Sequence, residues 1–213
     1  MPRSTKVFGG VGAFFQKGSD ETIMTYGLLG EKLSHSFSPQ IHRALGNPHY
    51  ALPELHKEAI EEFFQKREFS AINVTIPYKQ TVIPYLDSVS DVAQRIGAVN
   101  TIVNRNGRLF GYNTDYYGMK ALLEKAGIDA AGKKVLILGT GGTSKTAQVV
   151  VRDLGAAEML VVSRSRGENV ITYQEAAAQH ADAQVIINTT PCGMYPDCDA
   201  SPIGLAAFAK LEG

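Results

Sequence analysis

The sequence carries no net charge and has neither a long apolar run nor a strongly basic segment. Its 213 residues include twenty-one basic and twenty-one acidic side chains, and no run of Lys and Arg exceeds two residues. This balance argues against a surface that binds nucleic acid or a membrane. Without about eighteen consecutive apolar residues, no membrane-spanning helix is expected. The hydrophobic content of 44% can supply a buried core, and a small molecule is the expected partner.

Cysteine is also scarce, and only Cys192 and Cys198 are present. They lie in one loop rich in Pro and Gly, where a disulfide would close a very short ring. Free thiols and a cytoplasmic location are therefore expected. Histidine recurs at positions 35, 42, 49 and 56, but prolines at 48 and 53 break any helix through this series. No metal site is expected from it.

Residues 1–23 need a separate interpretation, because two basic residues precede the apolar run 7–15. Glycines interrupt this run and no small-residue cleavage motif follows it, which argues against a signal peptide. We expect residues 1–23 to be a poorly ordered leader and Met24 to be the functional start.

Three short β-prone runs, 71–76, 98–103 and 109–112, end in polar side chains, and strand ends are where α/β proteins bind ligands. The polar residues are Asn73, Thr75, Lys79, Asn100, Thr101, Asn113 and Asp115. One cation and one anion among neutral groups suit a hydroxylated small molecule, with Lys79 transferring a proton and Asp115 orienting a hydroxyl. Alternatively, Lys79 is solvated, Asp115 caps the next helix and the asparagines close turns.

A second candidate site precedes these runs. Ser36 and Ser38 lie at the start of a helix that we expect to extend to about Leu45, with Ser38 as N-cap and Pro39 as the first helical residue. Two hydroxyls at a helix N-terminus suit an anion, such as a substrate carboxylate. In the alternative interpretation, Ser38 only caps its own helix.

The remaining pattern up to residue 126 predicts alternating strands and helices. We expect strands at 23–29, 50–55 and 71–76, helices at 58–67, 89–96 and 116–126, and a further helix opened by Pro77. The strands 99–103 and 109–112 are expected to form a hairpin, because Asn106-Gly107 is a typical two-residue turn.

From residue 132 the pattern changes to that of a dinucleotide-binding unit. A strand at 133–138 runs into Gly139-Thr140-Gly141-Gly142-Thr143-Ser144, and a helix follows to Leu154. Glycines in such a turn let the backbone approach a pyrophosphate. Ser144 replaces the third glycine of the usual spacing, but a small residue still permits close packing of the helix on the strand.

The segments after the next two strands are expected to determine which cofactor binds. Strand 159–162 is followed by Ser163-Arg164-Ser165-Arg166, where an NAD-binding unit usually has an acid. An arginine fork there suits the 2′-phosphate of NADP, although the alternative is a solvated pair. Strand 185–187 precedes the polar loop 188–194, which is expected to face the nicotinamide. Cys192 in this loop is expected to pack and not to act as a nucleophile, because no His lies near it.

From about Tyr26 to Pro196 the chain resembles a shikimate dehydrogenase. The matching motifs, in family order, are Ser36–Pro39, Asn73–Lys79, Gly97–Thr101, Asn113–Asp115 and Asn188–Met194. The resemblance implies that Lys79 and Asp115 are the catalytic pair. The substrate-binding residues that it implies are Ser36, Ser38, Thr75, Asn100, Thr101 and Asp115. The implied cofactor-binding residues are Gly139, Thr140, Gly141, Gly142, Thr143, Ser163, Arg164, Thr189 and Met194.

The resemblance further implies NADP-dependent, reversible reduction of 3-dehydroshikimate to shikimate, by a cytoplasmic monomer or homodimer. It implies an α/β substrate-binding catalytic domain at 24–118, a connecting helix and linker at 119–131, and a doubly wound Rossmann NADP-binding domain at 132–213. Family members continue with another strand and a helix that supplies a substrate-binding Gln. We therefore expect a C-terminally truncated chain with an incomplete Rossmann domain.

Three alternatives remain open at this point. The chain could be a quinate/shikimate dehydrogenase that uses NAD, which Arg164 disfavours. It could be a methylene-tetrahydrofolate dehydrogenase, which shares a two-domain plan and a catalytic Lys, but Ser36 and Ser38 favour a small carboxylate. It could also be an inactive fragment or a ligand-binding module that lacks the C-terminal helix, and the intact Lys79 and Asp115 argue against this for its ancestor.

Overall fold

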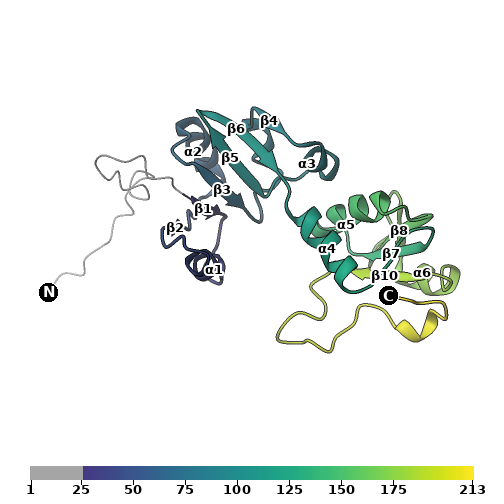
Figure 1. Ribbon diagram of the computed structural model, residues 1–213. Coiled ribbons are helices and arrows are strands. Elements are labelled where there is room, and N and C mark those ends of the chain that lie inside the picture. The colour runs from purple at the N-terminus through teal and green to yellow at the C-terminus, as the bar shows by residue number, and fades with distance from the viewer. Residues whose placement is uncertain (1–25) are drawn as a thin grey trace. The chain divides into compact units, whose positions relative to one another are not determined.

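The computed structural model describes residues 26–213, which cluster into two compact units. Unit 1 contains the described residues up to Gln94 together with Ala98–Asn113, and unit 2 contains Arg95–Gly97 and Thr114–Gly213. Each unit has its own sheet (Figure 1). The mixed α/β architecture confirms the predicted fold class. The predicted leader at 1–23 lies outside the described residues, and the assignment of substrate and NADP to separate domains stays a prediction.

Unit 1 is built on a six-stranded mixed sheet with the order β2-β1-β3-β5-β6-β4 (Figure 1). β1 pairs in parallel with β2 and β3, whereas β5 runs antiparallel to both β3 and β6. The strands are β1 Tyr26–Leu29, β2 Tyr50–Ala51, β3 Ala71–Val74, β4 Ser88–Val89, β5 Thr101–Arg105 and β6 Arg108–Tyr112. The helices are α1 Ser38–Ala44, α2 Ile60–Lys66 and α3 Asp91–Ile96, which begins in this unit.

One face of this sheet packs into the hydrophobic core, and the other, the polar face, carries Asn73 and Thr101 together with apolar side chains such as Leu28 and Val103. In β3, Ile72 and Val74 are buried while Asn73 between them is only half-buried, because successive strand side chains point to opposite faces. The core face packs against Phe63 and Phe64 of α2. The opposite face therefore carries Asn73 and, on β5, its register partner Thr101.

The β5-β6 hairpin confirms the prediction made from Asn106-Gly107. Arg105 and Arg108 pair at the end of the two strands. Asn106 and Gly107 have φ values of 54° and 82°. A two-residue type I′ turn requires positive φ at both of its central positions, so the local sequence determines this turn.

Other local predictions for unit 1 were wrong. The helix expected after Pro77 is a series of turns at 76–82, followed by the 3-10 helix Ile83–Tyr85. The strand expected at 50–55 is limited to Tyr50–Ala51 and an isolated bridge from Glu54 to Gly30, the residue after β1. Ser38 is the first residue of α1 and not its N-cap, which is Phe37. After Pro77, backbone bonds from Thr75 to Leu29 and from Val99 to Lys79 hold the segment as turns. At α1, the Ile41 N–H donates to the Phe37 carbonyl, which makes Phe37 the N-cap.

Asp87 joins the end of α2 to the hairpin. Its Oδ2 accepts a hydrogen bond from the Leu109 N–H at 2.7 Å and one from Arg67 Nη1 at 2.8 Å. The Leu109 bond, followed by the Arg67 guanidinium, lowers the pKa of the Asp87 carboxyl. Because the folded chain favours the carboxylate, this contribution to stability is present above the unfolded pKa of about 4 and is lost as pH falls through the lowered folded value.

We expect Asp87→Asn to lower the urea midpoint of unfolding at pH 7 by about 0.3 M, a modest shift because the pair is partly solvated. The difference from wild type should shrink between about pH 4 and pH 2, since the wild-type carboxyl becomes protonated there. Urea titrations at several pH values measure this. Glu62→Gln, which removes the i,i+4 pair with Lys66, is the control with little expected change. A constant difference at all pH values would contradict the assignment.

Unit 2 contains a parallel four-stranded sheet with the order β10-β7-β8-β9. Its strands are β7 Lys134–Leu138, β8 Glu158–Ser163, β9 Val170–Thr172 and β10 Val185–Asn188. The helices are α4 Asp115–Lys125, α5 Gly142–Asp153 and α6 Tyr173–Gln179 (Figure 1). The pair β9 and α6 was missed from the sequence, although Thr172 and Glu175 form a capping box at the start of α6. Their T-x-x-E spacing was a usable signal.

The helices α5 and α6 cover opposite faces of β7. Val135 and Ile137 pack with Val151 of α5, whereas Leu136 and Leu138 pack on the other side, in the cluster that contains Ala176 of α6. These four side chains of β7 are at most 1% exposed. A strand buried on both faces reads as a continuous apolar run, which is why the sequence predicted β7 correctly.

Candidate active site

Ser36 and Ser38 lie in the turn that leads into α1. The Ser38 N–H donates to Ser36 Oγ at 3.2 Å, and the Ser36 N–H donates to the Leu33 carbonyl at 2.9 Å. Glu54 holds the start of this turn, because its Oε1 accepts from the Leu33 N–H at 2.6 Å. Both serines are half-buried. The structure thus brings the two serines together at one end of α1, as the motif predicts.

A hydrogen-bonded network lies on the polar face of the unit 1 sheet. Tyr50 Oη donates to Asn73 Oδ1 at 2.7 Å. Asn73 Nδ2 donates to Thr101 Oγ1 at 3.2 Å and to the Asn100 carbonyl at 3.4 Å. The Thr101 hydroxyl in turn donates to Asn100 Oδ1 at 3.0 Å. The structure therefore joins Asn100 and Thr101, two predicted substrate-binding residues, through direct contacts.

Thr75 and Lys79 are fixed at the two ends of one turn. The Thr75 N–H donates to the Leu29 carbonyl at 2.9 Å, which places the turn beside β1. The Lys79 carbonyl accepts from the Val99 N–H at 2.7 Å. Val99 directly precedes Asn100, so the backbone of Lys79 is anchored next to the network. Both Thr75 and Lys79 are half-buried.

Asp115 is the first residue of α4 and belongs to unit 2, whereas Lys79 belongs to unit 1. The catalytic pairing of the two side chains therefore stays a prediction. Asn113, two residues before Asp115, is 2% exposed, and its Nδ2 donates to the Ala98 carbonyl at 3.0 Å. This bond gives Asn113 a structural role, in line with the alternative interpretation in which the asparagines stabilise turns.

The glycine turn connects β7 to α5. Gly139 has φ of 107°, and a Cβ there would approach Thr189 Oγ1 to 3.0 Å and Thr190 Cγ2 to 3.1 Å. Gly141 is the N-cap of α5, and a Cβ on Gly141 or Gly142 would meet open space. Thr140 and Thr143 are exposed. Ser144 is fully buried, so a small side chain at the third glycine position fits, as predicted.

The two arginines after β8, Arg164 and Arg166, differ in their surroundings. Ser163 ends β8 and pairs in register with Thr172 of β9, which leaves Arg164 exposed directly after the strand. Arg166 Nη1 lies 3.0 Å from Glu175 Oε1, in an ion pair between an exposed arginine and a half-buried glutamate. Arg166 thus has a partner on α6, and Arg164 is the better placed candidate for a phosphate.

The loop after β10 is stabilised by its own polar side chains. Asn188 Nδ2 donates to the Cys192 carbonyl at 2.9 Å, and Asn188 Oδ1 accepts from the Thr190 hydroxyl at 2.7 Å. The Thr189 hydroxyl donates to the Leu138 carbonyl at 2.5 Å, which links this loop to the glycine turn. Met194 is 66% exposed. Both cysteines are free thiols, as predicted.

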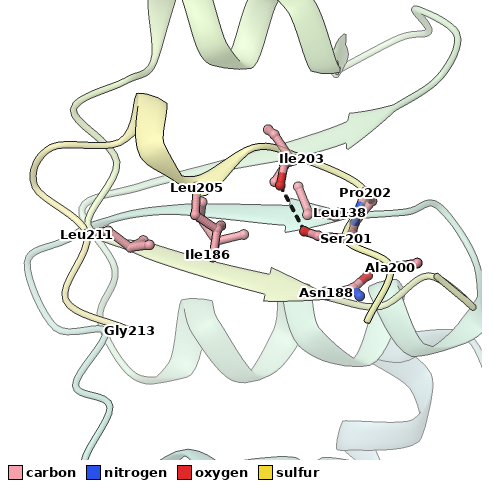
Figure 2. A pocket seen from close by; sticks show the side chains of 10 residues that line it. All are labelled: Leu138, Ile186, Asn188, Ala200, Ser201, Pro202, Ile203, Leu205, Leu211 and Gly213. Carbon is pink, nitrogen blue, oxygen red and sulfur yellow. Dashed lines mark hydrogen bonds between the residues drawn. The ribbon is translucent and has the colours of Figure 1, made fainter. Parts of the chain in front are cut away.

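A cavity of about 210 Å³ lies between β10 and the segment 200–213 (Figure 2). Its lining is mainly apolar, with Leu138, Ile186 and Ile203 among the side chains, and Ser201 Oγ donates to the Ile203 carbonyl at 2.8 Å. No lining side chain is titratable. It contains none of the predicted site residues.

The described residues give no sign of a metal centre or of a membrane span. Between Tyr26 and Gly213, no group of three His, Cys, Asp or Glu side chains could hold a metal ion. In the same range, no helix is long and apolar enough to cross a membrane.

Sequence reasoning missed Tyr50 as part of the site. It was predicted only as the first residue of a strand, yet its hydroxyl begins the network on the polar face. The sequence offers no local signal for this role, because Tyr50 and Asn73 are 23 positions apart and lie on strands separated by β1.

Comparisons with known proteins identify the family of this chain. A family model described as the shikimate dehydrogenase substrate binding domain matches residues 28–102. The chain is 40% identical over 195 residues to a protein of Clostridium beijerinckii named shikimate dehydrogenase (NADP(+)), and the match covers 84% of this chain and 72% of the relative.

Solved structures give the same result. Shikimate dehydrogenase 1 from Peptoclostridium difficile superposes with a TM-score of 0.73 at 39% identity, covering 87% of this chain and 74% of that one. The shikimate 5-dehydrogenase of Thermus thermophilus, in complex with NADP(H) and shikimate, gives a TM-score of 0.73 at 32% identity, covering 87% and 75%. The chain therefore belongs to the shikimate dehydrogenase family.

Proposed function

We propose that this chain catalyses the reversible, NADP-dependent reduction of 3-dehydroshikimate to shikimate. The observation that carries the proposal is the network of Asn73, Thr101 and Asn100, with the Lys79 backbone anchored at Val99 beside it. Neutral donors and acceptors close in the fold to one lysine suit a polyhydroxylated ring with a carbonyl to be reduced. The C. beijerinckii relative is named for NADP and shikimate, which supports the same substrate and cofactor here.

In this proposal Ser36 and Ser38 bind the substrate carboxylate, and Thr75, Asn100, Thr101 and Asp115 bind the ring hydroxyls. Hydrogen bonds from these hydroxyl and amide groups fix the orientation of the substrate ring, so that the reacting carbon is held in the correct position for the reaction. Asp115 would also stabilise the ammonium form of its catalytic partner, Lys79.

Lys79 is the proposed acid and base. During reduction, the substrate C3 carbonyl carbon accepts a hydride, the C=O electron pair moves to the oxygen, and the Lys79 ammonium gives that oxygen a proton. In the reverse direction, the neutral Lys79 amine takes the proton from the C3 hydroxyl. When bound, NADPH supplies the hydride.

The glycine turn of unit 2 fits such a cofactor. Space stays open beyond Gly141 and Gly142 at the start of α5, where backbone N–H groups can meet a pyrophosphate. Thr140 and Thr143 flank this space, Ser163 and Arg164 would hold the adenosine end, and Thr189 and Met194 would line the nicotinamide end. The exposed Arg164 suits a 2′-phosphate.

The direct test measures NADPH formation by its absorbance, with shikimate and NADP as reactants. Parallel reactions with NAD and with quinate test the alternative specificity, and calorimetry with shikimate tests binding. Turnover with shikimate and NADP supports the proposal. Binding without turnover would instead identify a ligand-binding module, and neither binding nor turnover would overturn the proposal. Size-exclusion chromatography distinguishes the proposed monomer from a homodimer, and fractionation tests the proposed cytoplasmic location.

Arg164→Ala is expected to raise the KM for NADP about tenfold and to leave the much weaker use of NAD unchanged. The reason is the loss of a charge-assisted contact with the 2′-phosphate, which NAD lacks. Initial rates with both cofactors measure the effect. Arg152→Ala, which removes an exposed arginine from the last turn of α5, is the matched control. An equal change in the KM for NADP and for NAD would show that Arg164 does not contact the 2′-phosphate.

A further inference from the structure

Tyr50 makes two specific contacts that the proposed chemistry does not use. Its ring stacks on His42 of α1, with ring centroids 3.7 Å apart and an interplanar angle of 12°. Its hydroxyl donates to Asn73 Oδ1 at 2.7 Å. One side chain on the short strand β2 thus contacts both α1, which follows the Ser36 turn, and β3.

The sheet register explains how Tyr50 reaches Asn73. Tyr26 of β1 pairs with Tyr50 on one side and with Ala71 on the other, so these three side chains share a face. Asn73 lies two positions beyond Ala71 and returns to the same face. Neighbouring strands are about 4.8 Å apart, and the long phenol spans β1 to place its hydroxyl at the Asn73 amide.

The direction of the hydrogen bonds that the Asn73 side chain makes is fixed. The backbone carbonyl of Asn100 can only accept a hydrogen bond. The Asn73 side-chain atom that faces it must therefore be Nδ2, and Oδ1 must face Tyr50. A tyrosine hydroxyl is protonated at neutral pH and can donate this bond, and burial raises the pKa of Tyr50 further, to about 12. With Asn73 Nδ2 donating to Thr101 Oγ1, the Thr101 proton is directed to Asn100 Oδ1.

We propose that Tyr50 is a positioning residue for substrate binding, which acts through Asn73 and Thr101 to hold the Asn100 side chain in one orientation. The stack on His42 connects the same residue to α1, which begins at Ser38 and directly follows the Ser36 turn. Tyr50 therefore holds the carboxylate-binding serines and the hydroxyl-binding Asn100 of unit 1 in a fixed relative position. This role rests on the proposed function, because it needs shikimate as the ligand of Asn100.

Removing the Tyr50 hydroxyl alone leaves the ring and its stack on His42 but frees the Asn73 amide to rotate. Tyr50→Phe is expected to raise both the KM and the calorimetric Kd for shikimate about fivefold to tenfold, the loss associated with one oriented hydrogen bond. The change in kcat should stay below about twofold, and the KM for NADP should not change. A purely structural role would lower the melting temperature without this selective effect on shikimate.

Two further variants test the route through the network. Thr101→Val breaks the link to Asn100, so adding Tyr50→Phe to it should cause no further increase in the shikimate KM. Thr101→Ser keeps the hydroxyl and the link to Asn100, so adding Tyr50→Phe to it should still raise the shikimate KM. Tyr85→Phe removes a phenolic hydroxyl from the same unit, on a ring stacked against Phe64, and should leave the shikimate KM unchanged.

The outcomes separate this inference from the proposed function. If wild type neither binds nor turns over shikimate, the proposed function fails and the role of Tyr50 fails with it. If wild type is active and folded Tyr50→Phe has the same shikimate KM and Kd, only the role of Tyr50 is overturned. Multiplicative effects of Tyr50→Phe and Thr101→Val would likewise overturn the route through Asn73.

Discussion

Lys79→Ala is expected to reduce kcat for shikimate oxidation by about two to four orders of magnitude, the usual contribution of a positioned general acid or base. Without the amine, the C3 hydroxyl loses its proposed general base, while hydride transfer still requires the hydroxyl proton to leave. The hydroxyl-binding residues Asn100 and Thr101 keep the hydrogen bonds that link them to each other and to Asn73. Shikimate should therefore still bind, with a Kd within about tenfold of wild type.

Stopped-flow or steady-state absorbance of NADPH gives the rate, and calorimetry gives the affinity. Lys66→Ala is a suitable control, because Lys66 lies on α2 in the same unit and forms an i,i+4 ion pair with Glu62. A Lys79→Ala variant with more than about a tenth of wild-type kcat would remove Lys79 from the chemistry. A variant that loses shikimate binding altogether would indicate a binding role instead.

The sequence was sufficient where a structure depends on neighbouring residues. Asn106-Gly107 adopts positive φ at both positions and produces the predicted hairpin. The apolar run of β7 followed by Gly139 predicted a buried parallel strand and its turn. In these segments local propensity and tertiary packing favour the same backbone, so the pattern is a reliable guide.

Prediction failed where distant partners decide the conformation. Pro77 is compatible with a helix start, yet Leu29 and Val99 bind the backbone on either side of it and hold 76–82 as turns. The same bonds place Lys79, so the site depends on contacts that the local pattern does not contain. The role of Tyr50 follows from strand order and register, since β1 lies between β2 and β3. A single sequence does not specify that order.

Gly139→Ala is expected to have the largest effect in unit 2, with the Kd for NADP raised about tenfold to a hundredfold. At φ of 107° an L-residue is strained, at a cost of about 1–3 kcal/mol. The new methyl group would also lie 3.0 Å from Thr189 Oγ1 and 3.1 Å from Thr190 Cγ2. The Thr189 hydroxyl donates to the Leu138 carbonyl, so displacing it would disturb both the glycine turn and the loop that carries Thr189.

Strain alone would lower stability without affecting NADP, and Gly132→Ala separates the two effects. Gly132 has φ of 68° in the turn before β7, and a Cβ there would meet nothing within 4 Å. Both alanine variants should therefore melt at a lower temperature than wild type, but only Gly139→Ala should weaken NADP binding measured by fluorescence titration. If the two variants lose stability equally and both bind NADP as wild type does, then Gly139 forms no part of the cofactor cradle, and the pyrophosphate must approach α5 from Gly141 and Gly142 alone.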